Sequence, residues 1–308
     1  MFESLYRQLL LGVADFAPMA AFMKRQGFKL GVGRFIAGED LDSALTAIHT
    51  LEQQNFRGIL DLLGEFVASE AGANAMTAEI LATLDRLEHE PLDKYMSVKP
   101  TQLGLGVSLD LALHNAHKVL ARARAIGAHI CLDMESAEYV DGTLALYRGL
   151  YTAGFGNLST VLQSYLYRSM DDLKVLTALN PALTIRIVKG AYRESPKVAY
   201  PKKEDVDANY RAMFRYAFAH GACANIASHD DGIINDVESY LATQKVDPAR
   251  VEFQLLYGVR LSLQKALRDR GHRVRIYVPY GHDWYGYFTR RLAERPANLM
   301  FVLRGLFR

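Results

Sequence analysis

A run of aromatic and charged residues near the end of the chain has the spacing of one helical face. The polar members stand at positions i, i+3, i+4 and i+7: Tyr287, Arg290, Arg291 and Glu294. An α-helix brings such positions onto one side. Two adjacent guanidinium groups repel each other unless an anion joins them, and an arginine fork suits a carboxylate or a phosphate. The run therefore predicts an anion site, while a solvated surface helix with a Glu–Arg pair is the simpler alternative.

Further polar residues fall at or near the ends of short apolar segments. They are Lys99, Asp133, Gln163, Arg186, Lys189, Ser228, His229, Gln254, Tyr277 and Tyr280. A charged group inside an apolar strand is costly unless it is paired or ligated. Any one of these residues could belong to a structural ion pair. Their recurrence at successive strand ends favours a shared site.

The apolar segments alternate with helical stretches from residue 58 onward. They span residues 58–65, 95–100, 129–135, 157–164, 183–190, 223–230, 251–258 and 273–281. Their spacing of roughly 25–40 residues is the size of a β-α unit. The pattern predicts an α/β protein with a parallel sheet closed into a (β/α)₈ TIM barrel, with an open doubly wound sheet as the alternative. Active sites of such barrels lie at the carboxyl ends of the strands.

The chain before the first strand has a different texture. Residues 1–57 show helical periodicity and no strand-like segment. Within them, a helix is predicted to begin near Glu39 or Asp40. Its apolar face would be formed by Leu41, Ala44, Leu45 and Ile48. We expect an N-terminal helical arm over residues 1–57, followed by one barrel domain over residues 58–308.

Composition excludes several classes of function. The 308 residues carry 36 basic and 34 acidic side chains, so no excess of one sign suggests nucleic-acid binding. Cys131 and Cys223 lie in apolar runs, as buried free thiols of a reduced compartment do. No residue cluster has zinc spacing, and no metal is expected. Without a signal peptide or a membrane-length apolar run, the prediction is a cytoplasmic protein.

Glycine-rich phosphate loops are also absent at the expected place. GVGRFIAG at residues 31–38 lacks the G-x-G-x-x-G spacing and precedes the first predicted strand instead of following it. We interpret it as a turn between helices.

Several segments resemble the proline dehydrogenase family, in the order that the family has them. The most specific are IRIVKGAYRE (185–194), YVPYG (277–281) and the W-x-x-Y-x-x-R-R-x-x-E run from Trp284 to Glu294. SVKPTQLG, CLDMES, TVLQSYLYRS, FQLLYG and the LLGE near Gly64 are also similar. The resemblance covers residues 58 to 296 and is nearest to the short monofunctional bacterial form. It implies a distorted barrel whose final helix caps the active site, with FAD bound at the strand ends without a Rossmann fingerprint.

The resemblance also implies a role for each matching residue. Asp133 and Arg186 are expected to be catalytic, with Asp133 organising the substrate and Arg186 stabilising negative charge near the flavin N5. The substrate would be bound by Lys99, Tyr192, Leu256, Tyr277, Tyr287, Arg290, Arg291 and Glu294. The cofactor would be contacted by Met134, Gln163, Arg186, Lys189, Gly190, Ala191, Ser228 and His229. Ser228-His229-Asp230 replaces the family's common Thr-His-Asn, which leaves the third contact open.

The implied reaction is FAD-dependent oxidation of L-proline to 1-pyrroline-5-carboxylate, by hydride transfer from the proline C5 to the flavin N5. It is the first step of proline catabolism to glutamate. Electrons would pass to a quinone, which brings the protein to the surface of the inner membrane; the oligomeric state stays open. One alternative is a Schiff-base aldolase or lyase with Lys99 or Lys189 as nucleophile. Another is a non-catalytic barrel that binds an anionic metabolite through Arg290 and Arg291.

Overall fold

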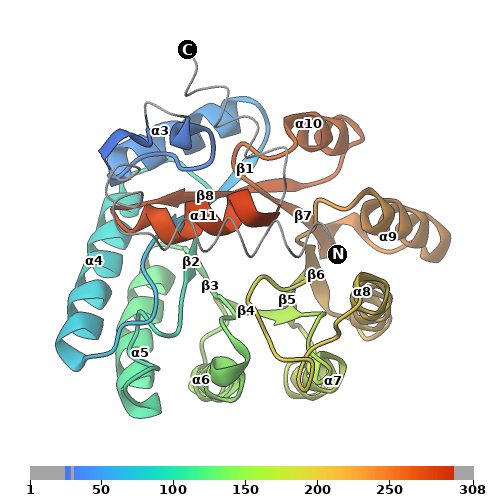
Figure 1. The fold of residues 1–308 in the computed structure, drawn as a ribbon, viewed down its shortest axis with the longest axis horizontal. Coiled ribbons are helices and arrows are strands. Elements are labelled where there is room, and N and C mark those ends of the chain that lie inside the picture. Colours follow the sequence, from blue (N-terminus) through green and yellow to red (C-terminus); the bar gives the residue numbers. More distant parts are fainter. Residues whose placement is uncertain (1–24, 29–30, 295–308) are drawn as a thin grey trace.

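The computed structural model describes residues 25–28 and 31–294, with side chains given up to Arg291. In the described chain, parallel strands β1 to β8 pair in sequence order, and β8 pairs with β1 to close a barrel (Figure 1). The strands are β1 (Arg57–Leu62), β2 (Tyr95–Val98), β3 (His129–Leu132), β4 (Leu158–Gln163), β5 (Thr184–Val188), β6 (Cys223–Ile226), β7 (Val251–Leu256) and β8 (Val274–Tyr280). The predicted (β/α)₈ barrel is confirmed, and the open sheet is wrong.

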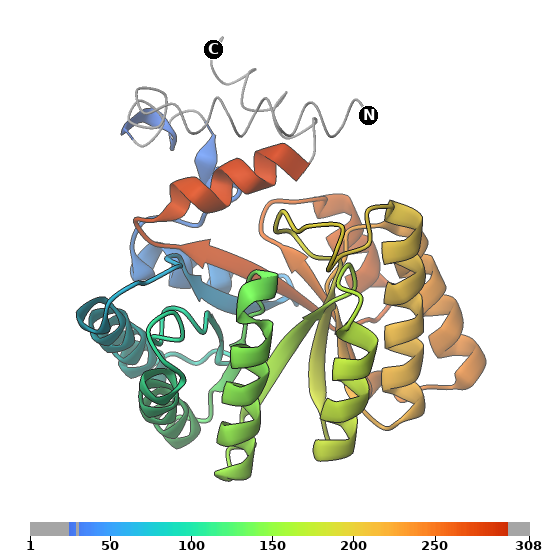
Figure 2. The ribbon, with the colours of Figure 1, turned by 60° about the horizontal axis from the view of Figure 1, so that its bottom comes forward.

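Helices surround this barrel on its outer side (Figures 1 and 2). They are α3 (Leu41–Gln53), α4 (Glu70–Glu88), α5 (Leu109–Ala125), α6 (Val140–Thr152), α7 (Ser169–Leu179), α8 (Lys203–Ala219), α9 (Asp231–Gln244) and α10 (Leu261–Asp269). The last described helix, α11 (Trp284–Glu294), is placed differently. Short 3₁₀ helices are η1 (Val32–Arg34), η2 (Ala137–Tyr139) and η3 (Pro248–Arg250). Each strand matches a predicted segment because continuous apolar runs are buried on both faces of a parallel sheet.

Helix α3 begins where the sequence predicts a helix. The side chain of Asp40 accepts a hydrogen bond from the Ser43 backbone N–H at 2.8 Å, which caps the first turn. Ala44, Leu45 and Ile48 are buried in the main core. Figure 1 shows α3 beside β1 and β8, on the outside of the barrel. The predictions for residues 1–24 lie outside the described residues.

Helix α11 follows the last strand but does not lie beside it. Figure 2 shows α11 crossing above the strand ends, over the barrel mouth. A separate buried apolar cluster holds it there, formed by Val32, Phe35, Ile36, Leu63, Val259, Trp284, Tyr287 and Phe288. The Trp284 indole also donates to Glu39 Oε1 at 2.8 Å. The predicted capping helix is therefore confirmed.

The opposite end of the barrel is closed by charged groups in place of the usual apolar layers. Arg275 on β8 donates from Nε to Glu252 Oε1 at 2.7 Å and from Nη2 to Asp93 Oδ2 at 2.9 Å. Arg275 and Glu252 are both buried. Burial lowers the pKa of Arg275, but Glu252 outweighs it and leaves that pKa raised. We call this cluster the barrel floor.

Three further observations concern the described residues. None of the helices in that part of the chain is long and apolar enough to cross a membrane. Across the same residues, no group of three or more histidine, cysteine, aspartate or glutamate side chains could hold a metal ion. Cys131 is buried and Cys223 partly buried, and both are free thiols.

Candidate active site

Asp133 stands at the centre of the barrel mouth, directly after β3. Its Oδ1 accepts a hydrogen bond from Arg186 Nη1 at 2.6 Å, and its Oδ2 accepts one from the Tyr277 hydroxyl at 2.7 Å. Lys99 Nζ lies 3.9 Å from Oδ2. One carboxylate thus gathers side chains from β5, from β8 and from the residue that follows β2. Four residues predicted from strand ends lie in direct contact.

Lys99 has a closer acidic partner that the sequence did not single out for a role. Its Nζ lies 2.7 Å from Asp61 Oδ1 on β1, and both side chains are buried. Burial lowers the pKa of Lys99, but Asp61 and Asp133 outweigh it and raise that pKa above its ordinary value. Burial raises the pKa of Asp61, against the attraction of Lys99. The available signal was an aspartate in the middle of the first apolar segment.

Arg186 is fixed from three strands. Besides its bond to Asp133, its Nε donates to Gln254 Oε1 at 2.6 Å and its Nη2 donates to Ser97 Oγ at 3.0 Å. Its Cζ also lies 5.4 Å from the centre of the Tyr277 ring. Burial works to lower the pKa of Arg186, whereas Cys131 and Asp133 raise it, and the net direction is upward. The guanidinium is permanently cationic. Ser97 was not among the polar residues predicted to share a site, and Gln254 was among them but was given no individual role.

The arginine pair of α11 lies over this cluster. Arg290 forms an ion pair with Glu65, in the loop after β1, with a spacing of 2.5 Å between Nη1 and Oε1. The Tyr192 hydroxyl donates to the other Glu65 oxygen at 3.4 Å, and Arg290 Cζ lies 6.0 Å from the Tyr192 ring centre. Burial, with Glu65 next, raises the pKa of Tyr192. Arg290 therefore joins the capping helix to the barrel, and its side chain is only 25% exposed.

The neighbouring residues of α11 complete this cover. Arg291 Cζ lies 5.1 Å from the ring centre of Tyr287, which is buried. Leu256 ends β7 and is partly buried. Glu294 is the last residue of α11, and its side chain lies outside the described residues.

The residues predicted to contact a cofactor occupy the rim from β3 to β6. Gln163 Nε2 donates to the Glu135 backbone carbonyl at 2.8 Å. Met134, which precedes Glu135 in the chain, is buried. Ser228 Oγ accepts from the Asp230 backbone N–H at 3.2 Å, and His229 Nε2 accepts from the Leu256 backbone N–H at 3.2 Å. Asp230 also caps α9, because its side chain accepts hydrogen bonds from the Gly232 and Ile233 backbone N–H groups.

The segment after β5 brings a lysine and a glycine to the same rim. Lys189 Nζ lies 2.5 Å from Asp207 Oδ1 and 2.8 Å from Asp230 Oδ2. Gly190 has a φ of +113°, and a Cβ there would lie 2.2 Å from the ring of Tyr165. This backbone position therefore accepts glycine and no larger residue. Ala191 and Tyr192 follow, both partly buried.

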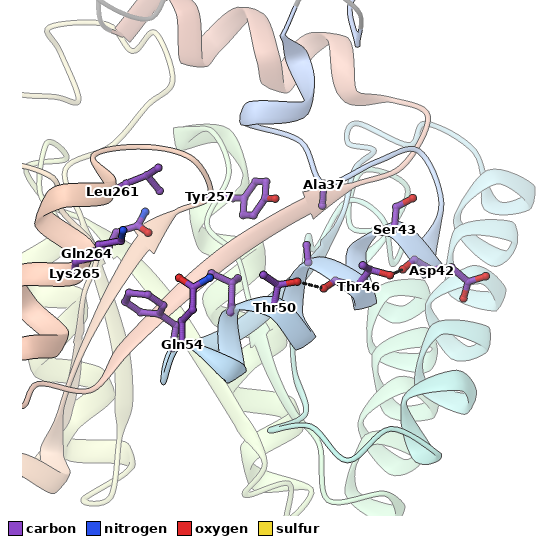
Figure 3. A pocket seen from close by; sticks show the side chains of 13 residues that line it. Ala37, Asp42, Ser43, Thr46, Thr50, Gln54, Tyr257, Leu261, Gln264 and Lys265 are labelled. Atoms are coloured by element: carbon purple, nitrogen blue, oxygen red, sulfur yellow. Dashed lines mark hydrogen bonds between the residues drawn. The ribbon is translucent and has the colours of Figure 1, made fainter.

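A groove of about 700 Å³ lies elsewhere, on the outside of the barrel between α3 and α10 (Figure 3). Its lining residues are Ala37, Asp42, Ser43, Thr46, Ala47, Thr50, Leu51, Gln54, Phe56, Tyr257, Leu261, Gln264 and Lys265. None of the predicted site residues lines it.

Comparison with known proteins shows which family the chain is related to. Residues 44–304 match the family model described as proline dehydrogenase. The chain is 42% identical to proline dehydrogenase from Deinococcus radiodurans, over the full length of both, and 37% identical to proline dehydrogenase 1 from Bacillus subtilis, over 98% of this chain and 99% of that one. Proline utilization A (PutA) from Bdellovibrio bacteriovorus, solved after inactivation by N-propargylglycine, has a TM-score of 0.80 at 26% identity; the match covers 91% of this chain and 34% of that longer one. The chain belongs to the proline dehydrogenase family.

Proposed function

We propose that this protein oxidises L-proline to 1-pyrroline-5-carboxylate with FAD as its cofactor, and that a quinone takes up the electrons. The observation that carries the proposal is the cluster in which Asp133 joins Arg186, Tyr277 and Lys99 beneath the arginine pair of α11. It combines anion-binding groups with a fixed cation at the mouth of a barrel. The membership of the proline dehydrogenase family supports proline as the substrate.

The donor groups at the rim fit a flavin. An isoalloxazine ring presents carbonyl oxygens and ring nitrogens, which need hydrogen-bond donors around them. Arg186 has five N–H donors, of which its bonds to Asp133, Gln254 and Ser97 use three. The Gln163 amide and the Ser228 hydroxyl add donors at neighbouring strand ends. When bound, the flavin supplies the acceptor for the hydride of the substrate.

Substrate positioning falls to the capping helix. Arg290 and Arg291 would bind the proline carboxylate, with Glu65 and Glu294 supporting the pair. Tyr192, Tyr287, Tyr277 and Leu256 would form the walls around the ring. Held in this way, the reacting carbon is already oriented for reaction when the substrate binds. Such positioning lowers the activation barrier by several kcal/mol. The helix also keeps bulk water from the reacting groups.

The groups beneath the substrate act electrostatically. Arg186 would stabilise negative charge that develops on the flavin ring as it is reduced. Asp133 holds the Arg186 guanidinium and the Tyr277 hydroxyl in place. The positive charge of Lys99 faces the carboxylates of Asp61 and Asp133. Each of these contacts exists before any ligand binds, so little reorganisation is needed during the reaction.

The same geometry disfavours the Schiff-base alternative. A nucleophilic lysine must be neutral, which requires a lowered pKa. Asp61 and Asp133 shift the pKa of Lys99 in the opposite direction. Lys189 is held between Asp207 and Asp230. Neither amine is arranged to attack a carbonyl carbon.

A direct optical experiment tests the function. Purified protein should be yellow, with absorbance near ~450 nm, and should lose this colour when L-proline is added without oxygen. A quinone should then restore it. Colourless protein that cannot be reconstituted with FAD, or yellow protein that keeps its colour with proline, would count against the proposal.

A further inference from the structure

We propose that Gln254 is a positioning residue for the flavin reaction: its amide fixes the orientation of the Arg186 guanidinium and ties it to the ion pair at the barrel floor. This inference rests on the proposed function, in which Arg186 faces the flavin. It concerns a buried residue of β7 inside the barrel.

The contacts of Gln254 define a bridge through the barrel interior. Gln254 lies on β7 and is 4% exposed. Its Oε1 accepts from Arg186 Nε at 2.6 Å, and its Nε2 donates to Glu252 Oε1 at 2.8 Å. Glu252 in turn accepts two hydrogen bonds from Arg275, at 2.7 and 3.0 Å. An unbroken series of bonds therefore joins Asp133 at the mouth to the barrel floor.

The chemistry of the two neighbours selects an amide and sets its orientation. Arg186 can only donate and the Glu252 carboxylate can only accept, so the bridging group needs an acceptor on one side and a donor on the other. The reversed amide would place N–H against N–H and oxygen against oxygen. A carboxylate at position 254 would repel Glu252, and a cation would repel Arg186. Glutamine supplies both roles without adding charge.

Losing this bridge should affect Arg186 more than the bound substrate. The Nε donor is buried, so removing its acceptor leaves an unsatisfied charged donor inside the barrel. Asp133 and Ser97 would still hold the Nη atoms, and the guanidinium could turn about these anchors. The result is weaker stabilisation of negative charge on the flavin. Proline binding through Arg290 and Arg291 should change little.

Sulfite is a suitable probe for this effect. It adds to N5 of oxidised flavin and leaves the ring negatively charged, so its affinity reports how well the protein stabilises that charge. Gln254→Met keeps the side-chain length and removes both hydrogen bonds. We expect FAD to remain bound, sulfite to bind about tenfold more weakly, and the two-electron potential to fall by about 30 mV, which corresponds to tenfold. The kcat should fall by about the same factor while KM for proline stays within about twofold.

A matched control separates this role from the general cost of losing a buried amide. Asn115 on α5 is buried, and its Nδ2 donates to Asn74 Oδ1 at 3.1 Å and to the Leu103 carbonyl at 3.2 Å. Asn115→Leu should lower the stability of the fold and leave sulfite affinity unchanged. If Gln254→Met does not fold, Gln254→Asn replaces it, because its amide is one methylene too short to span both contacts. The same loss of sulfite affinity is expected.

The outcomes distinguish this inference from the proposed function. Wild-type sulfite affinity and potential in a folded, yellow Gln254 variant would overturn the positioning role. Arg186→Met serves as the reference. If that variant also keeps normal sulfite affinity, the role of Arg186 in the proposed function fails. If Arg186→Met weakens sulfite binding and the Gln254 variant does not, only the bridge is refuted.

Discussion

Asp133 and Arg186 meet across the barrel mouth, with 2.6 Å between Oδ1 and Nη1, although they come from separate strands and lie more than fifty residues apart in the chain. The second oxygen of Asp133 accepts from Tyr277. A single carboxylate therefore sets the position of a permanent cation and of a phenol at once. Its removal should disturb several groups together.

Asp133→Asn tests this dependence. The substitution keeps the shape of the side chain but removes the charge that Arg186 and Lys99 face. We expect kcat/KM for proline to fall by about 100-fold or more, since hydrogen bonds to charged groups are lost in a buried site. Steady-state kinetics and FAD content give the measurement. Asp171→Asn, on an exposed ion pair with Lys174, is the control. Equal activity in the two variants would exclude an organising role for Asp133.

Arg291→Lys tests the proposed carboxylate clamp. Lysine keeps the charge but not the planar fork, so bidentate binding is lost. We expect KM for proline to rise about tenfold or more, while the FAD content stays unchanged. Arg270→Lys, in an exposed pair with Glu238, should leave KM as it is. Unaltered proline kinetics in Arg291→Lys would argue against the clamp.

The buried pair of Asp61 and Lys99 should behave non-additively in unfolding experiments. Lys99→Met leaves the Asp61 carboxyl buried without its cation, which should cost about 3 kcal/mol of unfolding free energy. Replacing Asp61 by Asn in the same chain removes the charge and should recover part of this loss. Urea titration of the two single variants and the double variant measures the coupling. Purely additive losses would mean that the pair does not act as a unit.

Gly190→Ala should affect the fold and the cofactor more than an equivalent change elsewhere. Gly190 has φ +113° and Gly154 has φ +89°, but a methyl group added at the first would lie 2.2 Å from a tyrosine ring, whereas one added at the second would meet nothing within 4 Å. Gly154→Ala therefore reports backbone strain alone, about 1 kcal/mol. Gly190→Ala should lose more stability and bind FAD more weakly, as measured by unfolding and by FAD titration. Matching losses would show that Tyr165 readily moves aside.

His129 should make the fold sensitive to acid. Burial, with the Arg275 guanidinium next, lowers the pKa of His129 to about 4, below its ordinary value. Above about pH 6.5 both the folded and the unfolded chain hold it neutral, and its contribution to stability is complete. As the pH falls from about 6.5 to about 4, the unfolded chain gains the proton ahead of the folded chain, and roughly 3 kcal/mol of unfolding free energy should be lost.

Comparison with His129→Gln isolates this part of the acid response. His129 Nε2 lies 2.8 Å from Ser159 Oγ, a contact that a glutamine amide can replace. Unfolding free energies at pH 7 and pH 4.5 should differ less in the variant than in the unchanged protein. An identical difference in both would assign the acid sensitivity to other groups.

Much of this protein could be predicted from local sequence. Apolar runs separated by helical stretches indicate a barrel, and polar residues at the run ends indicate its mouth. Asp133, Arg186 and Tyr277 were found in this way, because strand ends share one rim whatever their order around the barrel. The Arg290–Arg291 pair was found from helical spacing, which is equally local.

The tertiary structure alone decided which of these groups meet. Strand periodicity tells whether a side chain points inward, but the register around the closed barrel decides that Arg186 reaches Gln254 and that Lys99 reaches Asp61. Glu65 became a partner of Arg290 only because α11 crosses the mouth. On the outside of the barrel, α3 packs against β1 and β8. The local sequence predicts that α3 is a helix but not where it packs. Short-range spacing thus determined the elements and their polar ends, while contacts between distant strands and helices, which no local pattern encodes, determined the site.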